Sequence, residues 1–221
     1  MRLIAIRHGE TEWNVERREM GHLDSPLTPR GLLQAERIAT RLRTVKFDRL
    51  YSSDLRRAMT TAGAISDACG VPVIPHAGLR ERNLGIFQGM TRAEQRVRFP
   101  EEFAQLRQGE REYVIPQGES GAQRTERSVK TLTAIAGENS GGQVVVVTHV
   151  GFLLGFFEYV LALPPGGSWR YKRRNASFSS FTYEQGKWSL DTWNDTSHLD
   201  GMEALDDPLS ATTPIPEPSA P

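Results

Sequence analysis

Apolar residues in this chain occur both in short continuous runs and at helical spacing. Leu3–Ile6 and the four valines Val144–Val147 are continuous runs, which is typical of parallel strands buried on both faces. After Thr28-Pro29, an N-cap followed by proline in the first helical position, apolar residues recur at helical spacing as far as Leu42. This alternation of strands and helices predicts an α/β fold, with the valine run as a central strand.

The same pattern predicts further elements along the chain. A strand ending at Leu50-Tyr51 leads into a helix that reaches Ile65, with Ser52-Ser53-Asp54 as the expected cap. A short strand is expected over Val71–Ile74. Gly118-Glu119-Ser120 then opens another helix.

Three further stretches of the chain complete the expected fold. Ser177–Tyr183 and Trp188–Trp193 predict a hairpin on the sheet's edge. The Arg/Glu-rich middle of Glu81–Ile115 favours one or two surface helices that cover the sheet edge. Gly151–Leu163 is apolar but shorter than the roughly 20 residues that cross a bilayer, so a buried helix is expected there.

Composition narrows the class of protein. The 221 residues include 27 basic and 27 acidic side chains, so the net charge gives no reason to expect nucleic-acid or membrane partners. Cys69 is the single cysteine and no signal peptide is evident, which favours a cytoplasmic protein. From about Glu203 proline, serine and acidic residues predominate. We therefore expect one domain over residues 1–202 and a disordered tail over 203–221.

Candidate chemistry gathers at the strand ends. His8 and His149 each follow a buried strand, and ligands of open α/β sheets bind at the carboxyl ends of the strands. One imidazole can attack phosphorus while the other donates to a phosphate oxygen, and their order in the chain does not say which does which. Arg7 and Arg57 are placed to bind phosphate, although an arginine taken alone is more often in a surface ion pair. The other three histidines, His22, His76 and His198, are expected to be ordinary polar residues with hydrogen-bond partners and no catalytic role.

A series of ordered motifs resembles one known family, the phosphoglycerate mutase-like histidine phosphatases. The resemblance covers roughly Met1 to Leu199. Its opening motifs are Arg7-His8-Gly9-Glu10-Thr11, Trp13-Asn14, Gly21, Asp24-Ser25-Pro26-Leu27-Thr28, Gly31 and Gln34-Ala35. The later ones are Ser52-Ser53-Asp54-Leu55, Arg57-Ala58, Thr61-Ala62, Leu79, Glu81, Gly85, Gly89, Gly118-Glu119-Ser120, Thr148-His149 and Gly151. The resemblance implies a three-layer α/β/α sandwich with a mostly parallel central sheet.

The resemblance also implies roles for individual residues. His8 would be the nucleophile that forms a phosphohistidine, and Glu81 would protonate the leaving alkoxide and then activate water. Without the resemblance, Glu81 in its charged run would be read as a solvated ion pair. The implied catalytic set is His8, Glu81, His149, Arg7 and Arg57. The implied phosphate-binding set is Arg7, Asn14, Gly21, Arg57, His149 and Gly151.

A few positions bear on specificity. Met20 stands where many relatives place glutamine or threonine, and a thioether cannot donate a hydrogen bond. Thr60 stands where many relatives have glutamine, in the helix after Arg57. A neutral change on the helix surface is the favoured explanation. Trp13 and Phe87 either line a substrate pocket or, as is commoner for large aromatics, pack in the interior. The basic cluster at residues 170–174, Arg-Tyr-Lys-Arg-Arg, either attracts an anionic substrate or is a solvated loop.

The leading hypothesis is a phosphatase of a small phosphorylated metabolite. The stretch between Glu81 and His149 is compact, whereas the family's cofactor-dependent mutases carry a longer insertion there. A mutase, a non-catalytic phospholigand-binding protein and a phosphoprotein phosphatase are the alternatives. We expect no metal and no cofactor, because the carboxylates do not cluster at ligand spacing. A homodimer would be common for a soluble enzyme, but no sequence feature selects an interface.

Overall fold

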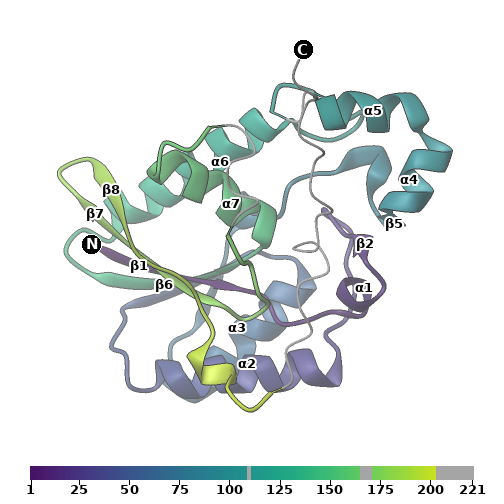
Figure 1. Ribbon diagram of the computed structural model, residues 1–221. Coiled ribbons are helices and arrows are strands. Elements are labelled where there is room, and N and C mark those ends of the chain that lie inside the picture. Colours follow the sequence, from purple (N-terminus) through teal and green to yellow (C-terminus); the bar gives the residue numbers. More distant parts are fainter. Residues whose placement is uncertain (109–110, 165–170, 203–221) are drawn as a thin grey trace.

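The centre of the molecule is a six-stranded sheet. The computed structural model describes residues 1–108, 111–164 and 171–202 (Figure 1). Its sheet has the order β4-β3-β6-β1-β7-β8, in which the first four strands are parallel and the last two antiparallel to their neighbours. The strands are β1 (Arg2–Arg7), β3 (Arg49–Ser52), β4 (Val73–Pro75), β6 (Gln143–Thr148), β7 (Phe178–Glu184) and β8 (Lys187–Asp195).

Helices cover both faces of the sheet, which confirms the expected sandwich (Figure 1). Alternate residues of β1 face opposite layers, because successive side chains of a strand point to opposite faces. Ile4 and Ile6 pack in the core beneath α2 (Pro29–Leu42) and α3 (Arg56–Cys69). Leu3 and Ala5 pack in the core beneath α6 (Gly121–Glu138) and α7 (Val150–Val160).

The predicted central strand is confirmed. β6 lies between β3 and β1, and each of its four valines is 0% exposed. Val145 and Val147 belong to one core, whereas Val144 and Val146 belong to the other. The run is continuously apolar because both of its faces are buried.

Two predicted helix starts and the hairpin are also confirmed. Thr28 caps α2 by accepting from the Gly31 N–H, and Ser120 opens α6 with a capping box to Gln123. β7 and β8 form the expected hairpin, which adds to the free side of β1. The strand expected over Val71–Ile74 is observed slightly later, as β4.

The predicted cap of α3 is wrong. The N-cap is Leu55, whose side chain makes no capping hydrogen bond. Asp24, from a distant loop, accepts from the backbone N–H groups of Arg56 and Arg57 instead, at 2.5 and 3.3 Å. Asp54 is unavailable because its carboxylate holds Arg80 in a bidentate pair at 2.7 and 2.6 Å.

The expected position of the charged surface helices is also wrong. α4 (Arg92–Arg98) and α5 (Pro100–Gln108) lie beyond the carboxyl ends of the strands, away from both sheet edges (Figure 1). They follow a two-stranded ribbon of β2 (Arg18–Glu19) and β5 (Met90–Thr91). Buried Gln95 ties α4 to this ribbon by donating to the Glu19 carboxylate and the Phe87 carbonyl.

Short elements complete the described chain. They are α1 (Glu12–Val15) and the 3-10 turns η1 (Ala77–Leu79), η2 (Gly85–Phe87) and η4 (Ser197–Leu199). The apolar stretch expected to be a buried helix is α7. Among the described residues, no helix combines the length and apolarity needed to cross a membrane. The tail expected from residue 203 lies outside the described residues.

Candidate active site

The two predicted site histidines meet at the carboxyl ends of β1 and β6. The His8 N–H donates to the Thr148 carbonyl at 3.0 Å, which links the two strand ends directly. The imidazole centroids of His8 and His149 lie 5.1 Å apart, and the ring planes are inclined by 56°. Both side chains are almost fully buried. Parallel pairing of β1 with β6 thus brings together two residues that are far apart in the sequence.

The ring of His8 is held in one tautomer. Its Nδ1 lies 2.7 Å from the Gly9 carbonyl oxygen, which can only accept, so Nδ1 carries the proton. Nε2 of the neutral ring therefore keeps its lone pair. Burial, and then the charges of Arg57 and Arg7, hold the pKa of His8 well below its usual value. A neutral imidazole with a free Nε2 is the form that can act as a nucleophile.

His149 is oriented by a serine that sequence reasoning did not assign to the site. Its Nε2 lies 2.7 Å from Ser53 Oγ, at the end of β3. Within the described ranges, the buried Nδ1 of His149 has no hydrogen-bond partner. Burial, followed by the charge of Arg57, lowers the pKa of His149 well below its usual value. The ring therefore has one nitrogen fixed by Ser53 and the other available to a ligand.

Arg57 is buried at the start of α3 and is held by the loop that contains Gly21. Its Nη1 donates to the Leu23 carbonyl and to Asp24, and its Nη2 donates to the Gly21 carbonyl at 2.8 Å. Gly21 has a φ of 54°, and a Cβ there would overlap the Gln88 side chain. Burial lowers the pKa of Arg57, and nearby Asp24 opposes this shift. Gly21 thus acts on Arg57 through its backbone.

Arg7 and Asn14 are linked to the basic cluster and the residue that follows it, and through that residue to the backbone of His8. Arg7 is buried, and its Nη1 donates to the carbonyl of Arg173. Asn14 Oδ1 accepts from the Thr11 N–H at 3.1 Å and from Asn175 Nδ2 at 3.2 Å. Asn175 Nδ2 also donates to the His8 carbonyl. Part of the basic cluster therefore supports the site through its backbone; residue 170 lies outside the described ranges.

Glu81 lies at the N-terminus of α7. Its Oε2 accepts from the Gly151 N–H at 2.9 Å, and its Oε1 accepts from the N–H groups of Phe152 and Arg82 at 2.9 and 2.7 Å. A helix N-terminus offers unpaired N–H groups to an anion. A Cβ at position 151 would overlap Glu81 Oε1, so glycine is required for this approach. The Gly151 N–H thus binds the Glu81 carboxylate, and its expected role in phosphate binding stays a prediction.

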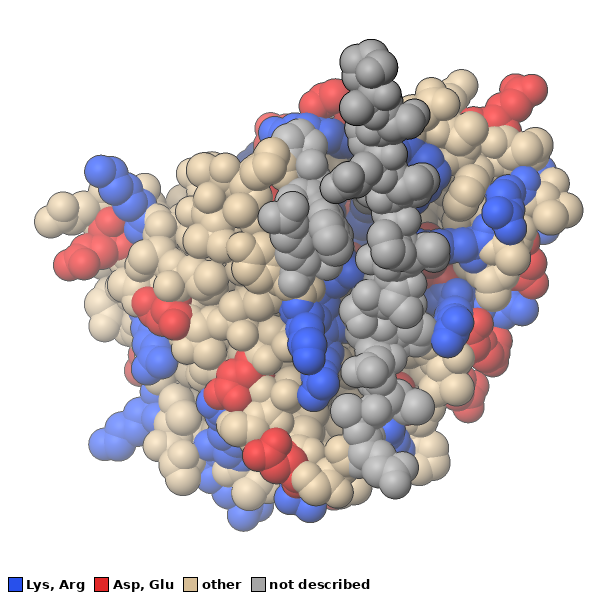
Figure 2. All heavy atoms as spheres, in the orientation of Figure 1, with Lys and Arg blue, Asp and Glu red and all other residues tan. Residues whose placement is uncertain are grey.

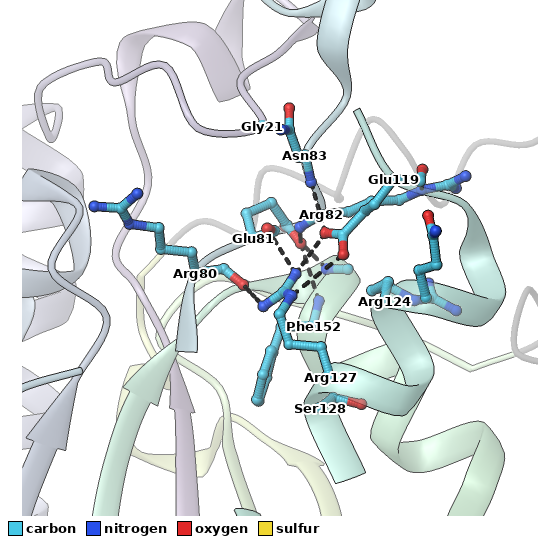
Figure 3. Close-up of polar contacts among 12 residues, drawn as sticks. Gly21, Arg80, Glu81, Arg82, Asn83, Glu119, Arg124, Arg127, Ser128 and Phe152 are labelled. Atoms are coloured by element: carbon cyan, nitrogen blue, oxygen red, sulfur yellow. Dashed lines mark hydrogen bonds and ion pairs between the residues drawn. The ribbon is translucent and has the colours of Figure 1, made fainter. Parts of the chain in front are cut away.

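The backbone around Glu81 is held by residues that were not predicted. Arg127 and Glu119, both on or next to α6, form an ion pair whose closest atoms are 2.5 Å apart (Figure 3). Arg127 donates to the Glu81 carbonyl at 3.0 Å, and His22 Nε2 lies 2.9 Å from the same oxygen. Glu119 was visible as part of a family motif, but nothing in the sequence marked Arg127.

The remaining candidate side chains either have hydrogen-bond partners or pack in the interior. Phe87 is 0% exposed and stacks edge-on against Phe99, so it belongs to the interior. Met20 is buried, and its sulfur accepts from Thr11 Oγ1 at 3.5 Å. His76 accepts from the Gly78 N–H, and His198 donates to a backbone carbonyl.

The charged and ligating side chains of the described residues form no cluster that could hold a metal ion. No group of three or more His, Cys, Asp and Glu side chains gathers at metal-binding distance in residues 1–108, 111–164 and 171–202. On the face shown in Figure 2, basic and acidic side chains are interspersed. The positive charge relevant to the candidate site is local and comes from buried Arg7 and Arg57.

Comparison with known proteins agrees with this geometry. The model of the histidine phosphatase superfamily (branch 1) matches residues 3–196. The chain belongs to the histidine phosphatase superfamily. A probable phosphoglycerate mutase GpmB of Escherichia fergusonii is 36% identical over 218 residues, which cover 94% of this chain and 98% of the relative. This superfamily contains phosphatases and mutases, so the chain is an enzyme of that kind.

Two solved structures of the superfamily extend the comparison. Bacillus stearothermophilus YhfR is 30% identical, with a TM-score of 0.84 over 90% of this chain and 99% of that one. A mycobacterial glucosyl-3-phosphoglycerate phosphatase, solved with VO3, is 31% identical, with a TM-score of 0.77 over 88% of this chain and 99% of that one. Relatives therefore carry both mutase and phosphatase names.

Proposed function

We propose that this enzyme is a phosphomonoesterase that hydrolyses a small phosphorylated metabolite. His8 Nε2 attacks phosphorus, the bond from phosphorus to the ester oxygen breaks, and Glu81 donates a proton to the departing alkoxide. Water then attacks the phosphohistidine while Glu81 takes up its proton, the phosphorus–nitrogen bond breaks, and inorganic phosphate leaves. Neither step requires a metal ion or an organic cofactor.

The observation that carries this proposal is the state of the His8 ring. The Gly9 carbonyl fixes the proton on Nδ1, at a distance of 2.7 Å, and leaves Nε2 able to attack. A buried, neutral imidazole is a useful nucleophile toward an anionic phosphate only where cations offset the substrate's charge. Arg7 and Arg57 are the buried cations beside it, since both charges lower the pKa of His8.

His149 and Glu81 complete the proposed chemistry. His149 presents Nδ1, a buried nitrogen without a described partner, and would donate to a phosphoryl oxygen after taking up a proton. The charge of Glu81 acts on Arg57, and Glu81 is the carboxylate to which the family resemblance gives proton transfer. Positioned proton transfer of this kind contributes roughly 10²–10⁴-fold to a rate.

Phosphoglycerate mutase activity is the second candidate, because the Escherichia fergusonii relative carries that name. The two activities share the phosphohistidine and differ in its acceptor, which is water in one case and a second hydroxyl in the other. This relative is matched over 98% of its length, so chain length does not separate the two activities here. The phosphatase is favoured by the name of the mycobacterial structure, which has similar coverage.

The test is phosphate release from an aryl phosphate and a panel of phosphorylated metabolites, measured in chelator. Wild type and His8→Ala are compared, and mutase turnover of 3-phosphoglycerate is assayed in parallel. Release by the wild type that disappears in His8→Ala supports the proposal. Folded wild type that interconverts phosphoglycerates without releasing phosphate would make the enzyme a mutase, and absence of both activities would contradict catalysis through His8.

A further inference from the structure

Arg127 of α6 donates hydrogen bonds to the backbone that leads to Glu81. Its Nη1 donates to the carbonyls of Gly78 and Arg80, at 3.0 and 2.8 Å. Its Nη2 donates to the Glu81 carbonyl at 3.0 Å. Three carbonyls within four residues of chain therefore bind one guanidinium, as the dashed lines around Arg127 in Figure 3 show in part. A planar fork with five donors can make such a set of contacts, whereas an ammonium cannot.

Arg127 also contacts the residue that holds the other end of Glu81. The guanidinium carbon lies 5.7 Å from the centroid of the Phe152 ring, which Figure 3 shows beside it. The Phe152 N–H donates to Glu81 Oε1 at 2.9 Å. Arg127 thus touches both the backbone of Glu81 and the side chain of a residue that orients the Glu81 carboxylate.

Glu119 keeps Arg127 in this position. It accepts from Arg127 Nη2 at 2.5 Å and from Nε at 3.2 Å, in a bidentate pair. Its Oε1 also accepts from the Asn83 N–H at 2.8 Å, on the far side of Glu81. The pair therefore holds the chain both before and after Glu81. Its two side chains are 26% and 15% exposed, so solvent screens it less than a surface ion pair.

We infer that Arg127, held by Glu119, is a positioning residue that sets where the Glu81 carboxyl group stands relative to the leaving oxygen. The inference rests on the proposed function, in which Glu81 transfers protons. Arg127 does not touch the reacting atoms. It acts by fixing the Glu81 backbone, because displacement of a catalytic group by about 1 Å can cost about 10²-fold in rate.

A positioning role and a purely structural role predict different kinetics. Loss of the proton donor slows expulsion of an alkoxide strongly, but slows expulsion of 4-nitrophenolate little, because that anion leaves without protonation. Glu81 also serves hydrolysis of the phosphohistidine, which is common to both substrates, so the informative quantity is kcat/KM, which reports only the steps up to loss of the leaving group. Variants at Arg127 should therefore lose kcat/KM for an alkyl phosphate and largely keep kcat/KM for 4-nitrophenyl phosphate. General loosening of the fold would lower kcat/KM for both substrates together.

The experiment compares Arg127→Met, Arg127→Lys and Glu119→Gln with Glu81→Gln as the reference. For Arg127→Met we expect kcat/KM for an alkyl phosphate to fall by about 10–100-fold and kcat/KM for 4-nitrophenyl phosphate by less than about threefold. Arg127→Lys should recover only part of the loss, because it cannot form the bidentate pair. Glu119→Gln, which keeps an acceptor for Asn83, should show the same selectivity with a smaller loss.

Arg124→Met is the matched control. Arg124 lies on the same helix and is paired with Glu158 at 3.0 Å, in a similarly buried pair that does not contact the Glu81 backbone. Arg124→Met should change kcat/KM for the two substrates by the same factor. Equal losses for both substrates in the folded Arg127 variants, or no loss, would overturn the inference. If Arg127→Met does not fold, Glu119→Gln tests the inference instead, by its loss of kcat/KM for the alkyl phosphate relative to its loss for 4-nitrophenyl phosphate.

Glu81→Gln separates failure of the inference from failure of the proposed function. A selective loss in Glu81→Gln but not in the Arg127 variants overturns the positioning role alone. No selective loss in Glu81→Gln overturns the proton-transfer role of Glu81, and the positioning inference with it.

Discussion

Asp24 binds Arg57 at two places, its guanidinium and its backbone N–H. The Asp24 Oδ1 lies 3.0 Å from Arg57 Nη1 and 3.3 Å from the Arg57 backbone nitrogen. The other carboxylate oxygen accepts from the Arg56 N–H. One loop residue therefore caps α3 and offsets the charge of an arginine whose side chain is 1% exposed. Helix capping and charge compensation at the candidate site depend on the same carboxylate.

We expect Asp24→Ala to lower both stability and affinity for phosphate. The free energy of unfolding should fall by about 2–4 kcal/mol, because a buried charge loses its partner and a helix loses its cap. The inhibition constant of inorganic phosphate should rise by about tenfold as Arg57 loses its orientation. Denaturant unfolding and inhibition assays measure these effects. Asp24→Asn should keep part of the cap and lose less, and equal losses in both variants would argue against a role for the cap.

Ser53→Ala should reduce activity by releasing His149. The variant removes the oxygen 2.7 Å from His149 Nε2, so the ring can turn and its Nδ1 loses a defined direction. We expect kcat to fall by about tenfold. Ser180→Ala is the control, because Ser180 Oγ is also buried but has no hydrogen-bond partner among the described residues. Unchanged kcat in Ser53→Ala would show that packing alone orients His149.

Gly151→Ala should displace the Glu81 carboxylate from the N-terminus of α7. The new Cβ would overlap Glu81 Oε1. We expect kcat for alkyl phosphates to fall by about 10-fold or more. Gly63→Ala in α3 meets nothing within 4 Å and should leave activity intact. It should also stabilise the protein by about 0.5–1 kcal/mol, since glycine disfavours a helix interior. Wild-type kinetics in Gly151→Ala would contradict the observed contact.

Stability should decrease as the solution is acidified below about pH 6.5. The pKa values of His8 and His149 are lowered in the folded protein, in both cases first by burial. Below about pH 6.5 the unfolded chain binds protons on these rings that the folded chain does not, so acid favours unfolding. Each ring should contribute about 1.4 kcal/mol of loss per pH unit in this range.

Urea unfolding at pH 7.5 and 5.5 tests this dependence. The double variant His8→Gln, His149→Gln should lose about 2–3 kcal/mol less than wild type between these two pH values. His198, whose pKa burial lowers to about 4, should maintain part of the slope in both proteins. An identical slope in wild type and double variant would mean that the two rings titrate normally.

The elements predicted correctly from the sequence are those whose pattern reflects their own burial. The valine run of β6 is apolar on both faces because helices cover both faces. The start of α2 is visible because Thr28 bonds to the N–H of Gly31, only three residues away. Such signals are local, and the structure preserves them.

The predictions that failed depend on contacts between distant residues. The cap of α3 comes from Asp24, 32 residues before Arg56, while the nearby Asp54 is paired with Arg80. Arg127 has the sequence context of a solvated helix residue, yet it binds carbonyls 46 to 49 residues away. The histidines and arginines of the candidate site were singled out by their motifs. Asp24 and Ser53 lie in motifs as well, but nothing in the sequence paired them with Arg57 and His149.

The position of β1 in the sheet affects how the protein is made. This strand, which ends next to His8, pairs with β6 on one side and β7 on the other. On the ribosome, at about 5–20 residues per second, on the order of 10–30 s separates synthesis of β1 from that of β7. Until then the earliest strand lacks a neighbour on at least one side. The surroundings of His8 are therefore completed only after β7 has been synthesised.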